Sequence, residues 1–476
     1  MKKQITIAIA IISSLSGCIK EIDTQKGSQL NPLSGNTDIS AADLNKGFVA
    51  GEILVRFRTN VDITGINNAL SKISGKIKEH VLTKTMLGSG DQQGFYLVEV
   101  PIGIATAIEK MQGLAVVENA EPNYIVSAID ESNDPYYQGT VTDADLWGTY
   151  SDDATISTSV TTNEFGSQAE KAWYEGKTGS SGVIVGIIDA GIDPTHEDLQ
   201  GNIWENPNET PNDGIDNDGN GYKDDTYGWN FVSNTNNPMD DNNHGTHVSG
   251  TIGAKGGNAK GVAGICWNIK LIAAKFLSAS GSGTTANAVK AVDYITDLKS
   301  ANPGIVATNN SWGGGSKSRE LESAIKRANT ANILFIAAAG NSNADMNFKP
   351  NQAYPACYVV PNIIAVASLD KDGARSSFSN YSSKMVHLGA PGRGIYSSTS
   401  TLKGAPYYRS FNGTSMAAPH VTGACALYKA EYPTATAAQI KNAIITSAMQ
   451  TPTASMTGKT ITNGRLDVMK ALGVTP

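Results

Sequence analysis

The feature that most constrains the fold is a series of short apolar runs that begins at residue 181. The runs cover residues 181–188, 269–276, 304–309, 332–338 and 362–368. Helical patterns at residues 286–299, 319–329 and 437–447 lie between or after them. Strands that are apolar throughout are buried on both faces. Residues 181–476 are therefore predicted to form an α/β domain, a doubly wound and mostly parallel sheet with helices on both faces.

Length and charge narrow the function classes. The 476 residues are enough for two or three domains, and the 40% hydrophobic content is ample for their cores. The chain carries 37 basic and 44 acidic side chains, a formal charge of −7, and no long basic run. We therefore expect no nucleic-acid partner.

The N-terminus is typical of an exported protein. Lys2 and Lys3 precede an apolar run over residues 5–15, which is too short to span a membrane and ends in small residues. Residues 15–18 read Leu-Ser-Gly-Cys and resemble the lipobox of bacterial lipoproteins. Residues 1–18 are thus predicted to be a lipoprotein signal peptide with Cys18 as the lipidated residue, giving a membrane-anchored precursor exported from a bacterial cytoplasm. An ordinary secretory signal is the alternative.

Two further segments precede the α/β domain. Residues 19–47 are polar and read as a flexible tether. Residues 48–126 show strands at 51–57, 77–85, 95–100 and 116–126 and helices at 63–73 and 105–114. The order β-α-β-β-α-β predicts a small α+β ferredoxin-like unit. Residues 127–180 have few apolar runs and read as a linker that leads into the next domain.

A serine lies where a tight turn runs into a helix of small residues. Residues 411–420 read Phe-Asn-Gly-Thr-Ser-Met-Ala-Ala-Pro-His, and the helical pattern continues to Tyr428. Backbone N–H groups and the positive helix end would stabilise negative charge beside Ser415, so we predict that it is a nucleophile. The alternative is a serine that only caps a buried helix.

Two other residues supply the chemistry that a serine nucleophile needs. Asp189 ends an apolar strand, and His244 opens another helix of small residues. A carboxylate on one ring nitrogen fixes the tautomer that leaves the other free as a base. Asp189 could instead cap a turn. His247 lies three residues after His244, but no Glu stands in a metalloprotease pattern, so we disfavour a metal pair. His247, His196 and His420 are expected to be structural.

The order Asp, His, Ser is that of subtilisin. The sequence resembles the subtilisin family of serine proteases in three blocks, residues 188–192, 244–248 and 413–420. The resemblance implies that Ser415 attacks a peptide carbonyl, that His244 is its base and that Asp189 orients the base. A fourth block, residues 335–341, implies that the Asn341 amide donates to the oxyanion, although Asn341 could be only a turn residue.

The resemblance also implies how protein or peptide substrates bind. Segments that flank the substrate in this family match Gly281, Ser282 and Gly283, and Ser311, Trp312 and Gly313. Such glycine-rich edges can pair with an extended peptide through the main chain, which predicts broad sequence tolerance. The first side-chain pocket is expected among residues 312–313, 337–340, including Ala338 and Gly340, and 353–356. No charged residue lies in these segments, so the pocket is predicted to be apolar, with Ala353 a candidate to narrow it.

An acidic loop predicts a structural calcium ion. Residues 212–225 hold five aspartates in fourteen positions, and such crowding is destabilising unless a cation neutralises it. The first nine positions of an EF-hand-like loop are matched by Asp216, Asp218, Asn220, Tyr222 and Asp224. Position twelve is Tyr227 instead of Glu, so Asp213 or Asp225 is expected to complete the shell.

A solvated acidic loop that holds no ion is the simplest alternative to this calcium site. Asp198 matches a carboxylate that binds a different calcium ion in some relatives. Because the loop at residues 255–260 is short and lacks matching ligands, no second site is predicted.

Residues 48–126 resemble the inhibitory prodomain of the family, through their topology and the sequence Glu-Pro-Asn-Tyr-Ile at 121–125. The resemblance implies that the chain inhibits itself and is cut between about residues 126 and 168. Lipid on Cys18 would then anchor the prodomain, and the cut would free the protease. Less favoured functions are a tethered binding protein on an inactive protease fold and a calcium-dependent surface module.

Three cysteines follow Cys18, namely Cys266, Cys357 and Cys425. They can form at most one disulfide, and whether Cys266 pairs with Cys357 stays open. No Cys-x-x-Cys spacing occurs, so zinc is not expected.

Overall fold

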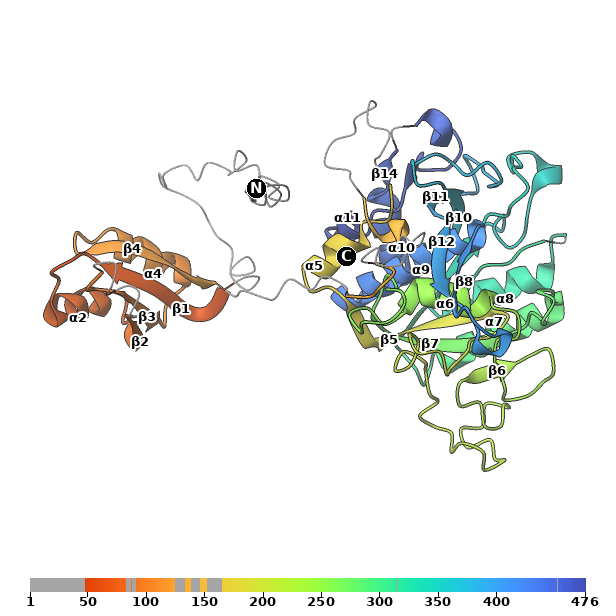
Figure 1. The fold of residues 1–476 in the computed structure, drawn as a ribbon, viewed down its shortest axis with the longest axis horizontal. Helices are drawn as coiled ribbons and strands as arrows, with labels where there is room; N and C mark the ends of the chain where they lie inside the picture. Colours follow the sequence, from red (N-terminus) through yellow and green to blue (C-terminus); the bar gives the residue numbers. More distant parts are fainter. Residues whose placement is uncertain are drawn as a thin grey trace, which may run out of the picture. The chain divides into compact units, whose positions relative to one another are not determined.

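The structure is a computed structural model that describes residues 48–82, 87, 91–124, 133–137, 146–151, 165–314, 316–451 and 453–476. The chain divides into two compact units, Met1–Ser127 and Ala128–Pro476, and each is described by itself (Figure 1). The predicted signal peptide with Cys18 and the tether at 19–47 lie outside the described residues. No helix in the described part of the chain is long and apolar enough to cross a membrane.

The first unit has the predicted element order. It contains β1 (Phe48–Phe57), α2 (Ile63–Ser71), β2 (Lys76–Val81), β3 (Phe95–Glu99), α4 (Ile104–Gln112) and β4 (Val117–Tyr124). The sheet is antiparallel, in the order β2-β3-β1-β4. Alternate strand residues such as Val55 and Val98 pack with Leu70 and Met111 of the helices. The ferredoxin-like topology is therefore confirmed.

The second unit is built on a nine-stranded sheet in the order β14-β15-β11-β10-β9-β8-β5-β7-β6. Its strands are β5 (Gly179–Asp189), β6 (Gly228–Asn230), β7 (Asn268–Lys275), β8 (Ile305–Asn310), β9 (Leu334–Ala338), β10 (Ile363–Leu369), β11 (Leu388–Pro391), β14 (Met449–Gln450) and β15 (Gly464–Arg465). All pair in parallel except β14 with β15. The five predicted apolar runs are β5, β7, β8, β9 and β10.

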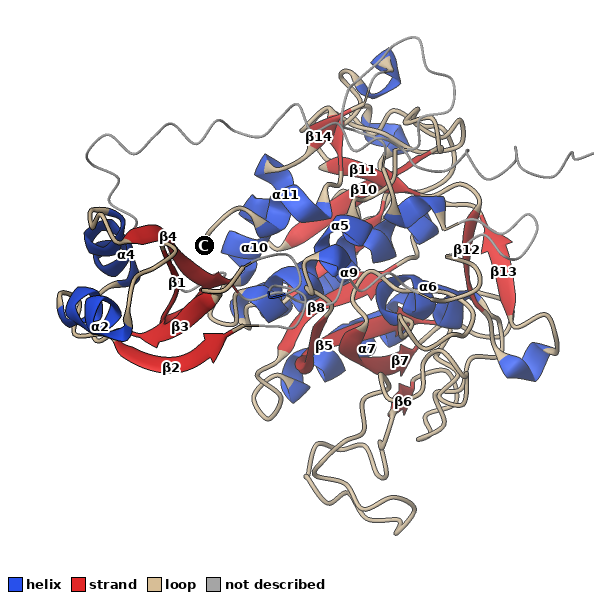
Figure 2. Cartoon of the chain, turned by 60° about the vertical axis from the view of Figure 1, so that its left-hand side comes forward, coloured by secondary structure: helices blue, strands red, loops and turns tan. Residues whose placement is uncertain are grey.

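Helices cover both faces of this sheet, which explains the unbroken apolar strands (Figure 2). One core contains α5 (Ala169–Tyr174), α6 (His244–Gly253), α9 (Thr414–Glu431), α10 (Ala437–Thr446) and α11 (Val468–Leu472); the other contains α7 (Thr285–Leu298) and α8 (Arg319–Thr330). Successive residues of β5 alternate between them. Val185 and Ile187 belong to the first core, and Ile184 and Ile188 to the second.

Smaller elements complete the second unit. A separate hairpin pairs β12 (Ile395–Ser398) with β13 (Tyr408–Phe411) and leads into α9. Short 3₁₀ helices are η2 (Trp147–Thr149), η3 (Lys349–Asn351), η4 (Thr401–Lys403) and η5 (Ala454–Met456). Within residues 127–180, expected as linker, the structure has η2, α5 and the start of β5. Trp173 of α5 is buried against Trp267, so this stretch contributes to the core.

The three cysteines of the second unit are free and buried. Cys266 and Cys357 therefore do not pair. Burial raises the pKa of the Cys266 thiol to about 12, so it stays protonated and behaves as a small apolar side chain.

Candidate active site

The candidate residues meet at the carboxyl ends of the parallel strands. Asp189 is the last residue of β5, His244 is the first of α6, and Ser415 is the second of α9. Asn341 follows the end of β9 by three residues. Sites in parallel sheets form at this edge because the strand ends and the helix N-termini converge there.

Asp189 and His244 form a hydrogen-bonded pair in which the aspartate is buried and the histidine side chain is 25% exposed. His244 Nδ1 lies 2.8 Å from Asp189 Oδ1, which also accepts from the Ala190 N–H at 2.7 Å. Asp189 is fully buried, and its Oδ2 has no hydrogen-bond partner among the residues that the structure describes. Burial alone would lower the pKa of His244, but the charge and hydrogen bond of Asp189, aided by Asp240, raise it above its ordinary value.

Ser415 is held by Ser311, the first residue beyond β8. Its hydroxyl donates to the Ser311 carbonyl at 3.0 Å, and the Ser311 hydroxyl donates to the Ser415 carbonyl at 2.7 Å. Among the described hydrogen bonds, none joins Ser415 Oγ to His244. The hydroxyl is therefore in a resting orientation, from which a side-chain rotation is needed to reach the histidine.

The amide of Asn341 is fixed with its donor toward the serine. Its Oδ1 accepts from the Thr414 N–H at 2.9 Å and from the Thr414 hydroxyl at 3.0 Å. A Cβ placed on Gly413 would lie 3.4 Å from Asn341 Nδ2 and 3.5 Å from the Ser415 nitrogen. Both donors thus border the space that glycine leaves open, an arrangement that suits an oxyanion.

A cleft of about 690 Å³ runs past His244, Ser415 and Asn341. All the predicted substrate-binding residues line it, namely Gly281, Ser282, Gly283, Ser311, Trp312, Gly313, Ala338 and Gly340. Ala353 and Tyr354 line it too, but Ala337 and Ala356 lie in the hydrophobic core behind it. No described Asp, Glu, Lys or Arg lines the cleft, so its wall is uncharged apart from the histidine.

The acidic loop brings together three carboxylates, of which sequence reasoning found two. Oxygen atoms of Glu209, Asp216 and Asp218 all lie within 4.8 Å of one another, close enough to share a cation. Glu209 is buried and accepts the N–H groups of Asn217 and Asp224 at 2.8 and 2.9 Å. It stands outside the EF-hand-like pattern, so no spacing rule could select it.

The other predicted calcium ligands are oriented differently. Asp224 accepts from the Gly214 N–H, and the Asn220 amide donates to Asp218 and Asp225. Asp225 also accepts from Tyr294 of α7 at 2.7 Å, and burial raises its pKa to about 6. Asp213, the other acid expected to complete the shell, caps the exposed turn at 215–217. Tyr222 packs its ring against Tyr294.

A second pair of buried carboxylates lies at the short loop 255–262. Asp134 accepts from the N–H groups of Gly257 and Asn258, and Asp198 accepts from the Asn258 amide and the Val262 N–H. Burial raises the pKa of Asp198 to about 7, and the nearby charge of Asp134 contributes. The sequence of this loop does not indicate the contact with Asp134, because Asp134 belongs to a distant segment of the chain.

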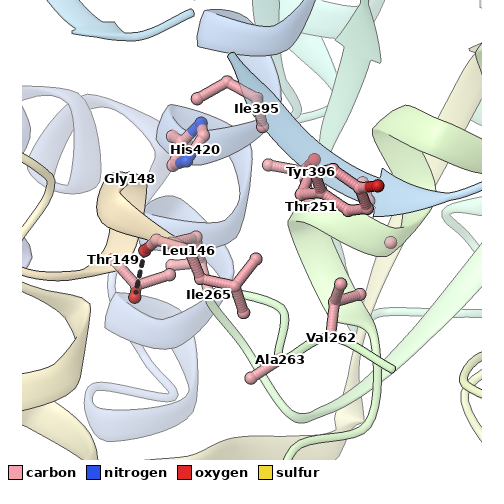
Figure 3. A pocket seen from close by; sticks show the side chains of 12 residues that line it. Leu146, Gly148, Thr149, Thr251, Val262, Ala263, Ile265, Ile395, Tyr396 and His420 are labelled. Carbon is pink, nitrogen blue, oxygen red and sulfur yellow. Dashed lines mark hydrogen bonds between the residues drawn. The ribbon is translucent and has the colours of Figure 1, made fainter. Parts of the chain in front are cut away.

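The remaining histidines have structural contacts. The buried His247 ring places Nε2 at 3.0 Å from the Ile395 and Arg409 carbonyls, and burial lowers its pKa to about 3. His420 Nδ1 lies 2.8 Å from the Met416 carbonyl, and its ring borders a small cavity of about 20 Å³ (Figure 3). His196 Nε2 lies 3.1 Å from the Tyr407 carbonyl. Within the described ranges, no group of three metal-ligating side chains includes a histidine.

Comparison with known proteins decides the family. Residues 180–468, more than half of the chain, match the model of the subtilase family. The chain belongs to the subtilase family. Residues 34–123 match the Fervidolysin N-terminal prodomain model. The protein is therefore a subtilisin-like serine protease with an N-terminal prodomain.

Curated relatives agree with this assignment. The Thermophilic serine proteinase of Bacillus sp. (strain AK1) is 30% identical over 430 residues, which are 90% of this chain and 89% of the relative. Subtilisin DY of Bacillus licheniformis is 35% identical over 296 residues, 62% of this chain and 94% of the relative. A solved cold adapted subtilisin-like serine proteinase is 33% identical and covers 60% of this chain and 87% of its own, with a TM-score of 0.46.

Proposed function

We propose that this subtilase is an autoprocessed endopeptidase in which Ser415 is the nucleophile, His244 its general base and Asp189 the residue that orients the base. The observation that carries the proposal is the 2.8 Å contact of His244 Nδ1 with the buried Asp189, at the same edge of the sheet as Ser415. That contact leaves His244 Nε2 as the ring nitrogen free to accept a proton.

The reaction begins when Ser415 Oγ turns from the Ser311 carbonyl to His244 Nε2. The histidine takes the hydroxyl proton as Oγ attacks the peptide carbonyl carbon, and the carbonyl oxygen becomes an oxyanion between Asn341 Nδ2 and the Ser415 N–H. The C–N bond then breaks, and His244 gives its proton to the leaving amine. Water, deprotonated by the same histidine, hydrolyses the acyl-enzyme.

Substrates are proposed to bind as extended peptides along the edges at 281–283 and 311–314, mainly through backbone hydrogen bonds. The uncharged cleft wall supports a preference for an apolar side chain before the scissile bond, with otherwise broad tolerance. Ala353 and Tyr354 stand on the wall of this pocket, so Ala353 is the residue proposed to limit its size.

Calcium is proposed to bind the acidic loop through Glu209, Asp216 and Asp218, with Asn220, Tyr222 and Asp224 as the remaining candidates. Three carboxylates within 4.8 Å repel one another, and a hard divalent cation with oxygen ligands relieves the repulsion. An ion would hold the acidic loop in place and take no part in peptide hydrolysis.

The order of segments supports a proposal for maturation. Cys18 is proposed to carry lipid that anchors the exported precursor to a membrane, and residues 48–126 to act as the intramolecular inhibitor until the chain is cut. Because the lipid and the prodomain are on the same side of the cut, processing would release the catalytic unit outside the cell.

The decisive experiment compares wild type with Ser415→Ala in the full-length chain. Loss of the nucleophile should leave the unprocessed precursor and abolish labelling by a fluorophosphonate, because this reagent reacts with the activated serine. In subtilisin the same loss costs about 10⁶ in kcat. Asn341→Ala, which keeps the nucleophile, should be labelled yet lose about 10²–10³ in kcat. Normal processing and labelling of Ser415→Ala would contradict the mechanism, and an unlabelled wild type would favour a binding protein on an inactive fold.

A further inference from the structure

Behind the nucleophile, a chain of buried hydrogen bonds leaves α9 and returns to it. Thr422 Oγ1 donates to Asn309 Oδ1 at 2.9 Å, and Asn309 Nδ2 donates to Ser311 Oγ at 3.0 Å. Ser311 Oγ in turn donates to the Ser415 carbonyl at 2.7 Å. Thr422 and Ser415 both belong to α9, so two side chains at the end of β8 bridge two points of one helix.

The chain is shielded from water. Thr422 and Asn309 are fully buried, and Ser311 is 3% exposed. Polar groups buried at this depth are costly unless they are hydrogen-bonded, and each side chain of the chain of bonds donates to the next group. The Thr422 hydroxyl also lies 3.1 Å from the Ala418 carbonyl of its own helix. When it donates to Asn309 Oδ1, the Asn309 amide nitrogen faces Ser311, and the Ser311 hydroxyl faces the Ser415 carbonyl.

The geometry restricts the first turns of α9 in two ways. Seven residues separate Ser415 from Thr422, which is about two helical turns, so both contacts lie on the same side of the helix. Holding both points against β8 fixes the position of the helix along its axis and its rotation about that axis. The same Ser311 that ends the chain accepts the resting Ser415 hydroxyl on its own carbonyl.

We infer that Thr422, Asn309 and the Ser311 hydroxyl are positioning residues that set the placement of Ser415 against His244. The inference rests on the proposed role of Ser415 as nucleophile. None of the three groups touches the reacting atoms, because the Ser311 hydroxyl is occupied by the Ser415 carbonyl. They act through the backbone of residue 415, whose N–H also faces the oxyanion. A small shift there changes both the attacking atom and one oxyanion donor.

The test uses Thr422→Val, which deletes the hydroxyl and keeps the branched shape, with Thr422→Ser as the control that keeps the hydroxyl. Ser311→Ala deletes the other end of the chain and leaves its carbonyl in place. We expect Thr422→Val and Ser311→Ala to lower kcat about tenfold with KM nearly unchanged, and to slow fluorophosphonate labelling by the same factor. Thr422→Ser should stay within about twofold of wild type.

The double variant Thr422→Val with Ser311→Ala separates positioning from general loss of stability. If both residues act through one chain, the double variant should be no slower than the slower single variant, because the first change already breaks the chain. The inference would be overturned if the fold-changes of the two single variants multiply in the double variant. It would also be overturned if folded Thr422→Val and folded Ser311→Ala keep kcat within twofold of wild type. If Thr422→Val does not fold, the kcat of Ser311→Ala alone tests the inference. Labelling of Ser415→Ala would refute the nucleophile instead.

Discussion

The basicity of His244 depends on a second carboxylate besides its hydrogen-bond partner. Asp240 lies four residues before the histidine and is fully buried. Its Oδ1 accepts from the N–H groups of Asn242 and Asn243, and its Oδ2 accepts from the N–H and hydroxyl of Thr246. Asp240 thereby caps α6 at the helix end that His244 opens, and its charge adds to that of Asp189 in raising the histidine pKa.

Asp240→Asn should therefore move the acid limb of the kcat/KM profile to lower pH. His244 must be neutral to accept a proton, and removing a nearby negative charge lowers its pKa. At acidic pH the variant should therefore retain a larger fraction of its maximal kcat/KM. We expect a shift to lower pH, with a lower maximum because the base is weaker. The melting temperature should also fall, because an amide donor replaces one acceptor in the cap.

Asp241→Asn is the matched control for this profile. Asp241 is the adjacent acid, but its side chain is 43% exposed and is paired with the buried Lys275 at 2.7 Å. Its removal should shift the acid limb less than Asp240→Asn does, because Asp241 is partly solvated and is not among the charges that raise the His244 pKa. Burial lowers the pKa of the nearby His247 to about 3, so it is neutral over the acid limb. Equal shifts in both variants would mean that net charge, not Asp240, sets the histidine pKa.

At the scale of elements, the sequence predicts those helices and strands that are long enough to show a regular hydrophobic pattern. The five long strands of the large sheet are apolar throughout because both of their faces are covered. The six elements of the first unit are visible in the sequence because one face of each is buried, which gives alternating strands and amphipathic helices. Strands β6, β11, β14 and β15 have two to four residues each, too few to show a period. The six-residue α5 lies in a polar stretch and is fixed by tertiary contacts of Trp173.

The residues of the candidate site also divide into those that the sequence predicts and those that it does not. Asp189, His244, Ser415 and Asn341 were predictable because each belongs to a contiguous block whose local structure the residues themselves specify. Glu209 was not, because it joins Asp216 and Asp218 only after the loop has folded back. The exchange of hydrogen bonds between Ser311 and Ser415 likewise depends on how β8 meets α9, a packing relation between segments 104 residues apart.

The acidic loop gives a prediction at this scale. Glu209→Gln keeps the shape of the side chain and removes one of the three clustered charges, so calcium affinity should fall at least about tenfold. Binding to the folded state alone adds about 2.7 kcal/mol at one hundred times Kd, and the variant should lose about half of that at the same concentration. The measurement is the melting temperature along a calcium titration, which separates ion binding from the effect of the mutation without calcium.

Asp213→Asn is the control for the loop. Asp213 belongs to the same acidic stretch, but its side chain caps an exposed turn and is not one of the three clustered carboxylates. Its calcium titration should follow wild type, because a solvated charge outside the ligand set contributes little. If Asp213→Asn loses as much calcium stabilisation as Glu209→Gln, the ion is held by the general field of the loop and not by the cluster.

At the scale of the whole molecule, the catalytic unit includes residues far upstream of its first long strand. Asp134 accepts three backbone N–H groups from residues 257–260, and Trp147 Nε1 donates to the Arg393 carbonyl at 3.1 Å. A cut after these residues would remove buried contacts from the mature enzyme. We therefore move the upper limit of the proposed processing window from residue 168 to Asn133 and set its lower limit at the end of β4, Tyr124.

Maturation at that point makes a prediction about where each product goes. If Cys18 carries lipid, a fragment ending between residues 124 and 133 should stay with the membrane. The catalytic unit, whose N-terminus should fall in the same interval by intact mass and N-terminal sequencing, should appear in the medium. Ser415→Ala should keep the whole chain in the membrane fraction, and Cys18→Ala should remove even the precursor from it. Washing with salt and a calcium chelator distinguishes residual association from anchoring. A processed catalytic unit that stays in the membrane fraction after both washes would contradict release, and a mature N-terminus beyond Asp134 would contradict the narrowed window.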